Sequence, residues 1–427
     1  MVRQVSALGG TATLLVSAIL VSACGEAAPE DVARSSEALQ KHGQSETFST
    51  LGPIDPHGEF FQAQGTNGRS CATCHLPSEA WSITPRTIRS LFAQTRGLHP
   101  IFNPLDADNP DTLDASSLRG RRQGYSMMLS RGVFRRGGAP RDGAEWELVA
   151  VDDPHGFANL NRLVQWRRAL PTIDFPLGSA TVNWDGGNSI GADQRAGLVN
   201  QATRNVTGGQ QGEPAPAAVI EEIVDFESSL FTTRVFVPGV GRLDECGAEG
   251  SPELLARQEK RAGRWDLFDA WLELVPGRCS HRGADKKRAQ IARGQELFNA
   301  PKAPGGSCAG CHDSANNGTN VQNRTFDIGT ASAEARTPDL PLYTFRNRAT
   351  GETRQLSDAG RGQVTGLWSD LGAFKTPTLR ALAARAPYFH NGIAETLDEV
   401  IDHYEAHLGF VFTERERRDL LAFLEAL

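Results

Sequence analysis

Two stretches of this chain decide its fold: Cys71-Ala-Thr-Cys74-His75 and Cys308-Ala-Gly-Cys311-His312. Each follows the pattern Cys-x-x-Cys-His, which is the attachment signature of a c-type haem. In that chemistry two thiols add to the two vinyl groups of one porphyrin, and the adjacent histidine binds the iron from one side. The two copies therefore predict two covalently bound haem c groups, with His75 and His312 as iron ligands.

The cysteine pairs allow two other interpretations. Two Cys-x-x-Cys pairs can share one tetrahedral zinc ion, and a single pair can work as a redox dithiol. Neither reading explains why a histidine follows both pairs directly. A zinc ribbon also places its pairs much closer together than these two, so haem attachment is the favoured interpretation.

The first residues predict export. Residues 1–23 run from Arg3 through an apolar stretch to Ser22-Ala23, which is typical of a signal peptide and too short for a stable membrane span. The run Val-Ser-Ala-Cys resembles a bacterial lipobox, so we expect Cys24 to carry lipid; an ordinary signal peptide cleaved nearby is the alternative. Residues 24–50 are polar and predict a flexible tether. The expected location is the periplasm or cell envelope, with membrane contact through the lipid anchor only.

The cysteine count supports this picture. The chain has seven cysteines, of which four belong to the haem motifs and one is Cys24. Cys246 and Cys279 remain, and an oxidising compartment allows them to pair. We therefore expect a disulfide between them, with two free buried thiols as the alternative.

The length of the chain bounds the number of domains, and its net charge limits the classes of partner. A chain of 427 residues is long enough for two or more domains. Its formal net charge of −7 argues against nucleic acid as a partner. The same charge fits a basic electron-donor protein that docks on the surface.

The expected fold class is mostly α, with two cytochrome-c-like haem domains and long loops. Apolar residues recur at helical spacing in 287–298, before the second haem motif, and in 413–427, where Thr413 is a good helix start. The segment 217–231 predicts the closing helix of the first unit, and 252–272 an additional helix. The expected domains are an enlarged N-terminal haem domain, 51–285, and a C-terminal haem domain, 286–427. The Gly-, Asp- and Pro-rich stretch 100–190 predicts loops over a haem face.

A more specific resemblance comes from the C-terminal half. The segment Phe374-Lys-Thr-Pro-Thr-Leu-Arg-Ala-Leu-Ala-Ala-Arg-Ala-Pro-Tyr-Phe-His-Asn-Gly392 resembles the bacterial di-haem cytochrome c peroxidase and MauG superfamily. Trp184-Asp-Gly186 is similar to the Trp-Asp-Gly element of that family. The resemblance implies that the N-terminal haem is the peroxide site and the C-terminal haem the electron-transfer site. It also implies that Trp184 relays electrons between them, whereas an ordinary core tryptophan is the alternative.

The resemblance also bears on the second ligand of the C-terminal haem. Peroxidase-type members use a methionine there, but the three methionines of this chain all lie in its first 128 residues. The matching position is Tyr404, and MauG-type enzymes have a tyrosine ligand there. An oxygen-donor tyrosine stabilises ferric iron. His403 and His407 are the rival ligands.

The N-terminal haem is expected to be open on its second side. Classical members place a histidine before the Trp-Asp-Gly element, whereas the corresponding run 166–174 contains none. The nearest histidine is His155, which is expected at the surface in an Asp-Pro-His-Gly turn. A five-coordinate iron that needs no reductive activation follows.

The family places a glutamine and, ten residues later, a glutamate at the peroxide site. Gln201 fits the first position, but Gln211 stands at the second, with Glu213 close by but out of register. An amide cannot accept and return the proton that helps to break the O–O bond. Either Glu213 or a water takes over this role, or the task of the chain is an oxidation driven by O₂ or peroxide rather than efficient peroxide reduction.

Lesser sites follow from the same resemblance. Asp174 and the stretch 375–377 are candidate ligands of one Ca²⁺ ion, which prefers oxygen donors. Arg380 and Arg385 are candidate partners of the haem propionates or structural arginines. His390 is expected to support the site without touching a haem iron.

The expected function is that of a di-haem oxidoreductase of the cytochrome c peroxidase type. Hydrogen peroxide would be reduced with electrons from a small cytochrome c or cupredoxin. One alternative is a MauG-like or rubber-oxygenase-like oxidase that acts on a protein or organic substrate. The other is a non-catalytic di-haem electron carrier.

Overall fold

The computed structural model describes residues 44–302 and 306–427. The predicted signal peptide, the lipidation site Cys24 and most of the predicted tether lie outside these residues. In the described part of the chain no helix is both long and apolar enough to cross a membrane.

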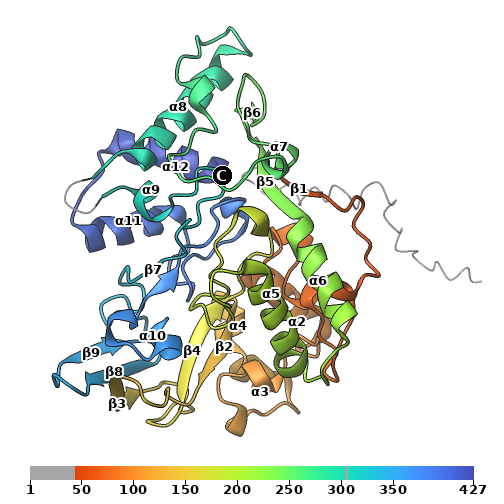
Figure 1. The fold of residues 1–427 in the computed structure, drawn as a ribbon, viewed down its shortest axis with the longest axis vertical. Coiled ribbons are helices and arrows are strands. Elements are labelled where there is room, and N and C mark those ends of the chain that lie inside the picture. The colour runs from red at the N-terminus through yellow and green to blue at the C-terminus, as the bar shows by residue number, and fades with distance from the viewer. Residues whose placement is uncertain (1–43, 303–305) are drawn as a thin grey trace, which may run out of the picture.

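Helices gather in two regions (Figure 1). One, at the top of the view, contains most helices of the C-terminal sequence, and the other contains those of the N-terminal sequence up to residue 229. The α-helices are α2 (Pro85–Thr95), α3 (Leu118–Gly124), α4 (Ser126–Arg131), α5 (Gln194–Arg204), α6 (Ala217–Ser229), α7 (Pro252–Ala256), α8 (Arg282–Asn299), α9 (Cys308–Cys311), α10 (Gly362–Thr365), α11 (Leu397–Leu408) and α12 (Glu414–Ala426).

The C-terminal helices form the unit expected around the second haem motif. Helix α8 leads into α9, which carries Cys308 and Cys311, and α12 packs closely against α8. Thr413 caps α12 in a capping box with Glu416, as its sequence predicts. Phe298 at the end of α8 and Phe423 of α12 meet in one apolar core at a ring distance of 5.4 Å.

The N-terminal unit is built around the first motif. Cys71 opens a single 3₁₀ turn, and α5 and α6 pack against each other beside it. The core beneath them contains Trp81, Leu198 and Ile223, all less than 4% exposed. The predicted helix 217–231 corresponds to α6, whereas the predicted helix 252–272 is reduced to the short α7 and a 3₁₀ turn at Asp269–Trp271. Residues between these two elements follow an irregular path because they wrap around Trp265 and Trp271, which are fully buried.

The fold contains more β-structure than a mostly α class implies. The strands form four small sheets in the described residues, in the orders β1-β5-β6, β2-β4, β3-β8-β9 and β7-β10. All their strand pairs are antiparallel. The strands are β1 (Gln44–Ser49), β2 (Val133–Gly138), β3 (Trp146–Asp152), β4 (Leu163–Arg168), β5 (Leu230–Val237), β6 (Gly241–Arg242), β7 (Thr325–Phe326), β8 (Leu342–Asn347), β9 (Thr353–Leu356) and β10 (Phe374–Lys375).

These strands correct two expectations. The stretch 100–190, predicted as loops, contains β2, β3 and β4 as well as α3 and α4. Residues 44–49 were predicted to belong to the tether, but they pair with β5 as strand β1. Both differences arise because partners distant in sequence satisfy the backbone, which local composition does not reveal.

The two predicted domains share structure. Strand β3 of the N-terminal half pairs with β8 of the C-terminal half, so one sheet contains strands from both. Figure 1 shows β8 and β9 beside β3, far from the C-terminal helices. Cys246 and Cys279 form a disulfide with a Cα–Cα distance of 6.0 Å, as the cysteine count predicts. The β3–β8 pairing therefore joins the two predicted domains through one sheet.

Candidate functional site

The first haem motif presents a histidine with one ring nitrogen already engaged. His75 Nδ1 lies 2.9 Å from the carbonyl oxygen of Trp81 and 2.8 Å from the hydroxyl of Thr172. Because a carbonyl only accepts, Nδ1 carries the proton and Nε2 keeps its lone pair for a metal. Burial lowers the pKa of His75, which keeps the ring neutral as a ligand must be.

The second motif repeats this arrangement. His312 Nδ1 donates to the carbonyl oxygen of Gly318 at 2.6 Å, and burial lowers the pKa of His312 to about 4. Gly318 has φ +79°, and a Cβ there would lie 2.7 Å from Trp265 Cζ2. Only glycine fits this turn, which aims the carbonyl at the histidine. Both motifs thus supply two half-buried cysteines and a neutral, oriented histidine.

Buried arginines show whether the residues present fit a haem group. Arg168, Arg380 and Arg385 form a buried arginine cluster in which Arg168 Nη2 donates to Arg385 O and Arg385 Nη2 donates to Arg380 O. Arg380 is 1% exposed, and its Nη2 has no hydrogen-bond partner among the described residues. Burial lowers the pKa of Arg168 and of Arg380 to about 10. A buried guanidinium needs an anion, and the two propionates of a haem supply that charge, so the residues fit the group.

Tyr404 and the two rival ligands of the C-terminal haem, His403 and His407, have different neighbours. Burial raises the pKa of the Tyr404 hydroxyl, with further contributions from Cys308 and Cys311, so the hydroxyl lies in the field of the second motif. His403 Nε2 instead lies 2.7 Å from the carbonyl oxygen of Ile328. The ring of His407 stacks on that of His403 at 6.0 Å, and a Cβ on Gly329 would lie 2.8 Å from His407 Nδ1. The two histidines therefore face the 328–329 turn.

Trp184 lies where the two halves meet. Its indole nitrogen donates to the carbonyl oxygen of Arg168 at 2.8 Å, and its own carbonyl accepts from the backbone of Lys375 at 2.8 Å. His390 is 2% exposed, stacks on Phe374 at 3.8 Å and contacts the Trp184 ring at 6.3 Å. Trp184 is therefore fixed by strand β4 on one side and by β10 on the other.

The two glutamines occupy different places. Gln201 is half-buried in the last turn of α5. Gln211 follows the π-helical turn Asn205–Gly209, has φ +58° and is exposed, and its Oε1 accepts from Asn67 Nδ2 at 3.3 Å. Its neighbour Gln210 is buried, and its amide binds Gln64 N and Asn205 Oδ1. Glu213 is exposed.

His155, which was expected at the surface, and Asp174, a predicted calcium ligand, are both more buried than expected. His155 was expected at the surface but is half-buried, with Nε2 3.0 Å from the carbonyl oxygen of Asp339. Asp174 is fully buried, and its carboxylate accepts from Thr232 N at 3.1 Å and from Thr378 Oγ1 at 3.5 Å. In the described residues the only group of three metal-ligating side chains is Cys246, Cys279 and Asp285, of which two form the disulfide. Calcium at Asp174 stays a prediction.

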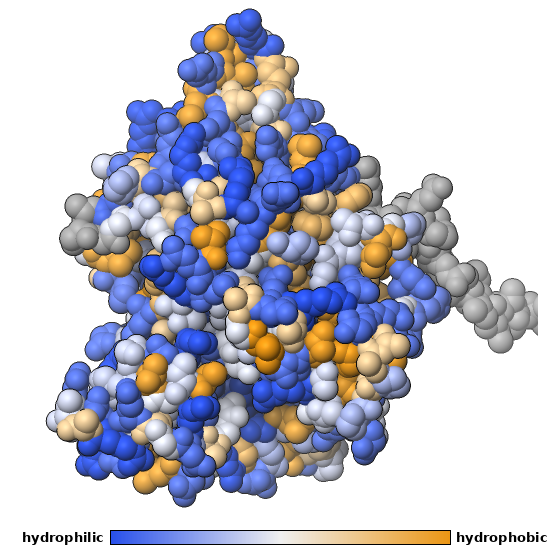
Figure 2. Space-filling model, in the orientation of Figure 1, coloured by the Kyte–Doolittle hydropathy of each residue, from blue (hydrophilic) through white to orange (hydrophobic). Residues whose placement is uncertain are grey.

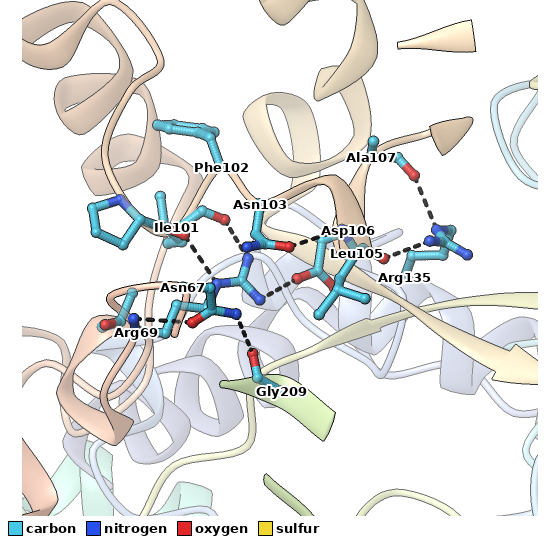
Figure 3. Close-up of polar contacts among 12 residues, drawn as sticks. Asn67, Arg69, Ile101, Phe102, Asn103, Leu105, Asp106, Ala107, Arg135 and Gly209 are labelled. Carbon is cyan, nitrogen blue, oxygen red and sulfur yellow. Dashed lines mark hydrogen bonds and ion pairs between the residues drawn. The ribbon is translucent and has the colours of Figure 1, made fainter. Parts of the chain in front are cut away.

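Sequence reasoning missed the residues that support the first motif. Arg69 Nη1 binds Asp106 at 2.7 Å and its Nη2 donates to Ile101 O at 2.6 Å, which ties the motif to the 100–106 segment (Figure 3). Thr172 on His75 has no local signal, because the two residues are 97 positions apart. Glu227 lies on α6 and is 5% exposed, and its charge helps to raise the pKa of the Cys71 thiol. Its Oε2 has no hydrogen-bond partner among the described residues.

Glu227 gives a pH-dependent prediction. Burial raises its pKa from 4.5 to about 8. Between these values the unfolded chain loses a proton that the folded chain keeps, so this group lowers stability as pH rises from about 4.5 to about 8. We expect Glu227→Gln to match the wild type below this window and to be more stable above it, by a few kcal/mol, in urea denaturation of the holoprotein. Glu221→Gln, on the solvent side of α6, is the control; a gap between Glu227→Gln and wild type that does not grow with pH would contradict the assignment.

Known proteins that are similar in sequence to this chain include c-type haem enzymes, the class that the two Cys-x-x-Cys-His motifs indicate. No family model matches the chain. It is 32% identical over 155 residues to the cytochrome-c peroxidase IdrP1 of Pseudomonas sp. (strain SCT), covering 32% of this chain and 39% of that protein. It is 28% identical over 275 residues to the methylamine utilization protein MauG of Methylorubrum extorquens, covering 61% and 64%. The chain is thus similar in sequence to bacterial di-haem cytochrome c peroxidases and to MauG, as its motifs predict.

The matches are partial. The chain spans about two fifths of the length of the cytochrome-c peroxidases that it matches. Among solved structures it is similar to a MauG-like protein associated with microbial copper homeostasis. That similarity has a TM-score of 0.35 and 21% identity, and it covers 61% of this chain and 73% of the other.

Proposed function

We propose that the chain is a di-haem c-type oxidoreductase of the cytochrome c peroxidase type. It reduces hydrogen peroxide to water at the N-terminal haem, with two electrons and two protons for each peroxide. The electrons come from a small cytochrome c or cupredoxin through the C-terminal haem. The observation that carries the proposal is that each motif presents a neutral histidine whose Nδ1 is held by a backbone carbonyl oxygen, His75 by that of Trp81 and His312 by that of Gly318.

The residues of the chain have separate roles in holding the two haems and in relaying electrons between them. A c-type haem supplies an iron that changes oxidation state and binds small oxygen species. Trp81 O and Gly318 O hold His75 and His312 as neutral ligands through their Nδ1 protons. Tyr404 would hold the C-terminal haem together with His312, whereas the run 166–174 offers no histidine that would hold the N-terminal haem beside His75. Trp184, held by Arg168 and Lys375, is the proposed relay between the halves.

Gln211 favours a second candidate function. Its amide cannot cycle a proton, and its side chain is exposed and held by Asn67. Proton delivery then depends on water or on Glu213, which is slower than a carboxylate in register. An oxidase that uses peroxide or oxygen on a protein or organic substrate tolerates this substitution. We place either activity in the cell envelope, with lipid on Cys24.

Low-temperature EPR of the ferric holoprotein tests the proposal. We expect one high-spin and one low-spin haem, with the high-spin signal lost when stoichiometric hydrogen peroxide is added. Tyr404→Phe should alter only the low-spin signal, and His403→Ala, which removes a ring bound to Ile328 O, should leave it unchanged. Two low-spin signals that do not change with peroxide would contradict an open catalytic haem in the ferric protein, and would leave an electron carrier or an enzyme that first needs reduction. Turnover without a donor cytochrome, with an organic or protein substrate oxidised, would favour the oxidase.

A further inference from the structure

A cavity of about 340 Å³ opens near the segment that precedes the first haem motif. Its walls are Asn103, Pro104, Leu105, Pro110, Arg135, Phe157 and Gln211. We call it the Arg135 pocket. It joins the segment after α2, strand β2, the turn between β3 and β4, and the loop that follows α5. Figure 3 shows Arg135 on one side of this region and Asn67 with Gly209 on the other.

The pocket combines an apolar wall with one fixed guanidinium. Arg135 Nε donates to the carbonyl oxygen of Ala107 at 3.0 Å and Nη2 donates to that of Leu105 at 2.5 Å (Figure 3). These two bonds use two of its five N–H groups and hold the planar fork in place. The guanidinium carbons of Arg135 and Arg162 lie 4.5 Å and 4.1 Å from the ring centroid of Phe157. Leu105, 37% exposed, adds apolar surface.

The local charge is positive although the chain is acidic. Arg136 and Arg162 are the cations that act on Arg135, and Asp106 and Asp111 are the anions. Asp106 is 1% exposed and is already bound by Arg69 at 2.7 Å and by Arg136 at 3.0 Å. Asp111 lies 3.8 Å from Arg162. Asp153 accepts from the backbone of Phe157 at 2.7 Å. Four arginines therefore accompany three aspartates around the pocket, on a chain whose net charge is −7.

The pocket adjoins the first haem motif. Asn67, four residues before Cys71, donates to Gln211 Oε1 at 3.3 Å and to Gly209 O at 3.0 Å. A molecule in the pocket would be near the motif rather than on a remote surface. Figure 2 shows, on the face that it presents, apolar residues scattered among hydrophilic ones.

We propose that the Arg135 pocket binds a small organic anion with a flat apolar body, of the aromatic carboxylate class. The carboxylate would pair with the remaining N–H groups of Arg135, and the ring would lie against Leu105, Pro104 and the edge of the Phe157 ring. Two guanidinium groups lie over the Phe157 ring and hold it in place. The role of this anion as an oxidisable substrate rests on the proposed function, but its binding does not.

Calorimetry on the ferric holoprotein tests the binding, with benzoate as the probe and benzyl alcohol as its neutral counterpart. We expect saturable binding of benzoate, at least tenfold tighter than that of benzyl alcohol, which weakens as salt is added. Arg135→Gln should weaken benzoate binding about tenfold or more, equivalent to about 1.4 kcal/mol. Phe157→Leu should weaken both probes while the preference for benzoate remains.

Arg348→Gln is the matched control, because Arg348 Nε also donates to two backbone carbonyls, those of Ala144 and Trp146, away from the pocket. It should leave benzoate binding unchanged. Absence of saturable benzoate binding at millimolar concentration, equal binding of the two probes, or equal loss in both arginine variants would overturn the proposal. Peroxide reduction is measured separately on the same samples. Benzoate binding without peroxide turnover would reject the proposed function and leave the anion site standing.

Discussion

Replacing Cys71 and Cys74 together by serine is expected to abolish peroxide turnover and to leave one covalently bound haem per chain. A serine hydroxyl does not add to a vinyl group under the conditions of haem attachment, so the first motif loses both of its covalent links. His75 alone would then have to hold the cofactor. The measurements are the haem content of the purified chain, its intact mass, and peroxide consumption with a reduced cytochrome as donor.

The second motif supplies the matched control. Cys308→Ser with Cys311→Ser should also leave one haem, but this variant should keep the peroxide-sensitive high-spin signal and lose only the sustained supply of electrons. The asymmetry follows from two predictions: Tyr404, whose hydroxyl is buried, is the second ligand at the second motif, and the run 166–174 supplies no histidine to the first. If the first-motif variant turns over peroxide and the second-motif variant does not bind it, the assignment of roles is reversed.

The sequence predicted the haem motifs and the three long helices because their signals are local. A Cys-x-x-Cys-His run is contiguous, and the apolar spacing of 217–231, 287–298 and 413–427 reports helices α6, α8 and α12 directly. The cysteine count also led to the disulfide between Cys246 and Cys279. Each of these inferences needs only neighbouring residues or a count.

The strands and the supporting contacts escaped prediction because they depend on distant partners. Strand β3 pairs with β8 nearly two hundred residues later, and Trp146 opposite Asn347 shows no local sign of this. Gly137 and Gly138 in β2 read as a loop, although both pair with β4. Likewise, Thr172 supports His75 from another segment, and Arg69 binds Asp106 across a loop. Local composition cannot report such pairs.

One glycine looks unfavourable in sequence and is required in the structure. Gly294 stands in the middle of α8, where glycine costs about 1 kcal/mol relative to alanine in an isolated helix. The structure explains it: α8 and α12 approach so closely that a Cβ on Gly294 would lie 1.9 Å from Asp419 O and 2.7 Å from Phe423 Cβ. The clash is with backbone and with a buried core side chain, neither of which can rotate away.

We therefore expect Gly294→Ala to destabilise the holoprotein, although alanine is the better helix former. Separating the helices would disturb the packing of Phe298 and Phe423 and the ion pair of Arg293 with Asp419 at 2.8 Å. Overpacking of this kind costs typically about 1–3 kcal/mol and occasionally more. This cost exceeds the propensity gain of about 1 kcal/mol, so the net change is unfavourable. The measurement is chemical denaturation followed by far-UV circular dichroism.

Gly283→Ala in the first turn of the same helix separates propensity from packing. Gly283 is exposed, and a Cβ there would meet only His281 Nδ1, at 3.4 Å. This variant should be as stable as the wild type or more stable by up to about 1 kcal/mol. Opposite signs for the two alanine substitutions in one helix would show that the α8–α12 contact determines stability there. If Gly294→Ala is as stable as Gly283→Ala, the two helices must lie further apart than described, and the core that supports the second haem motif must be looser.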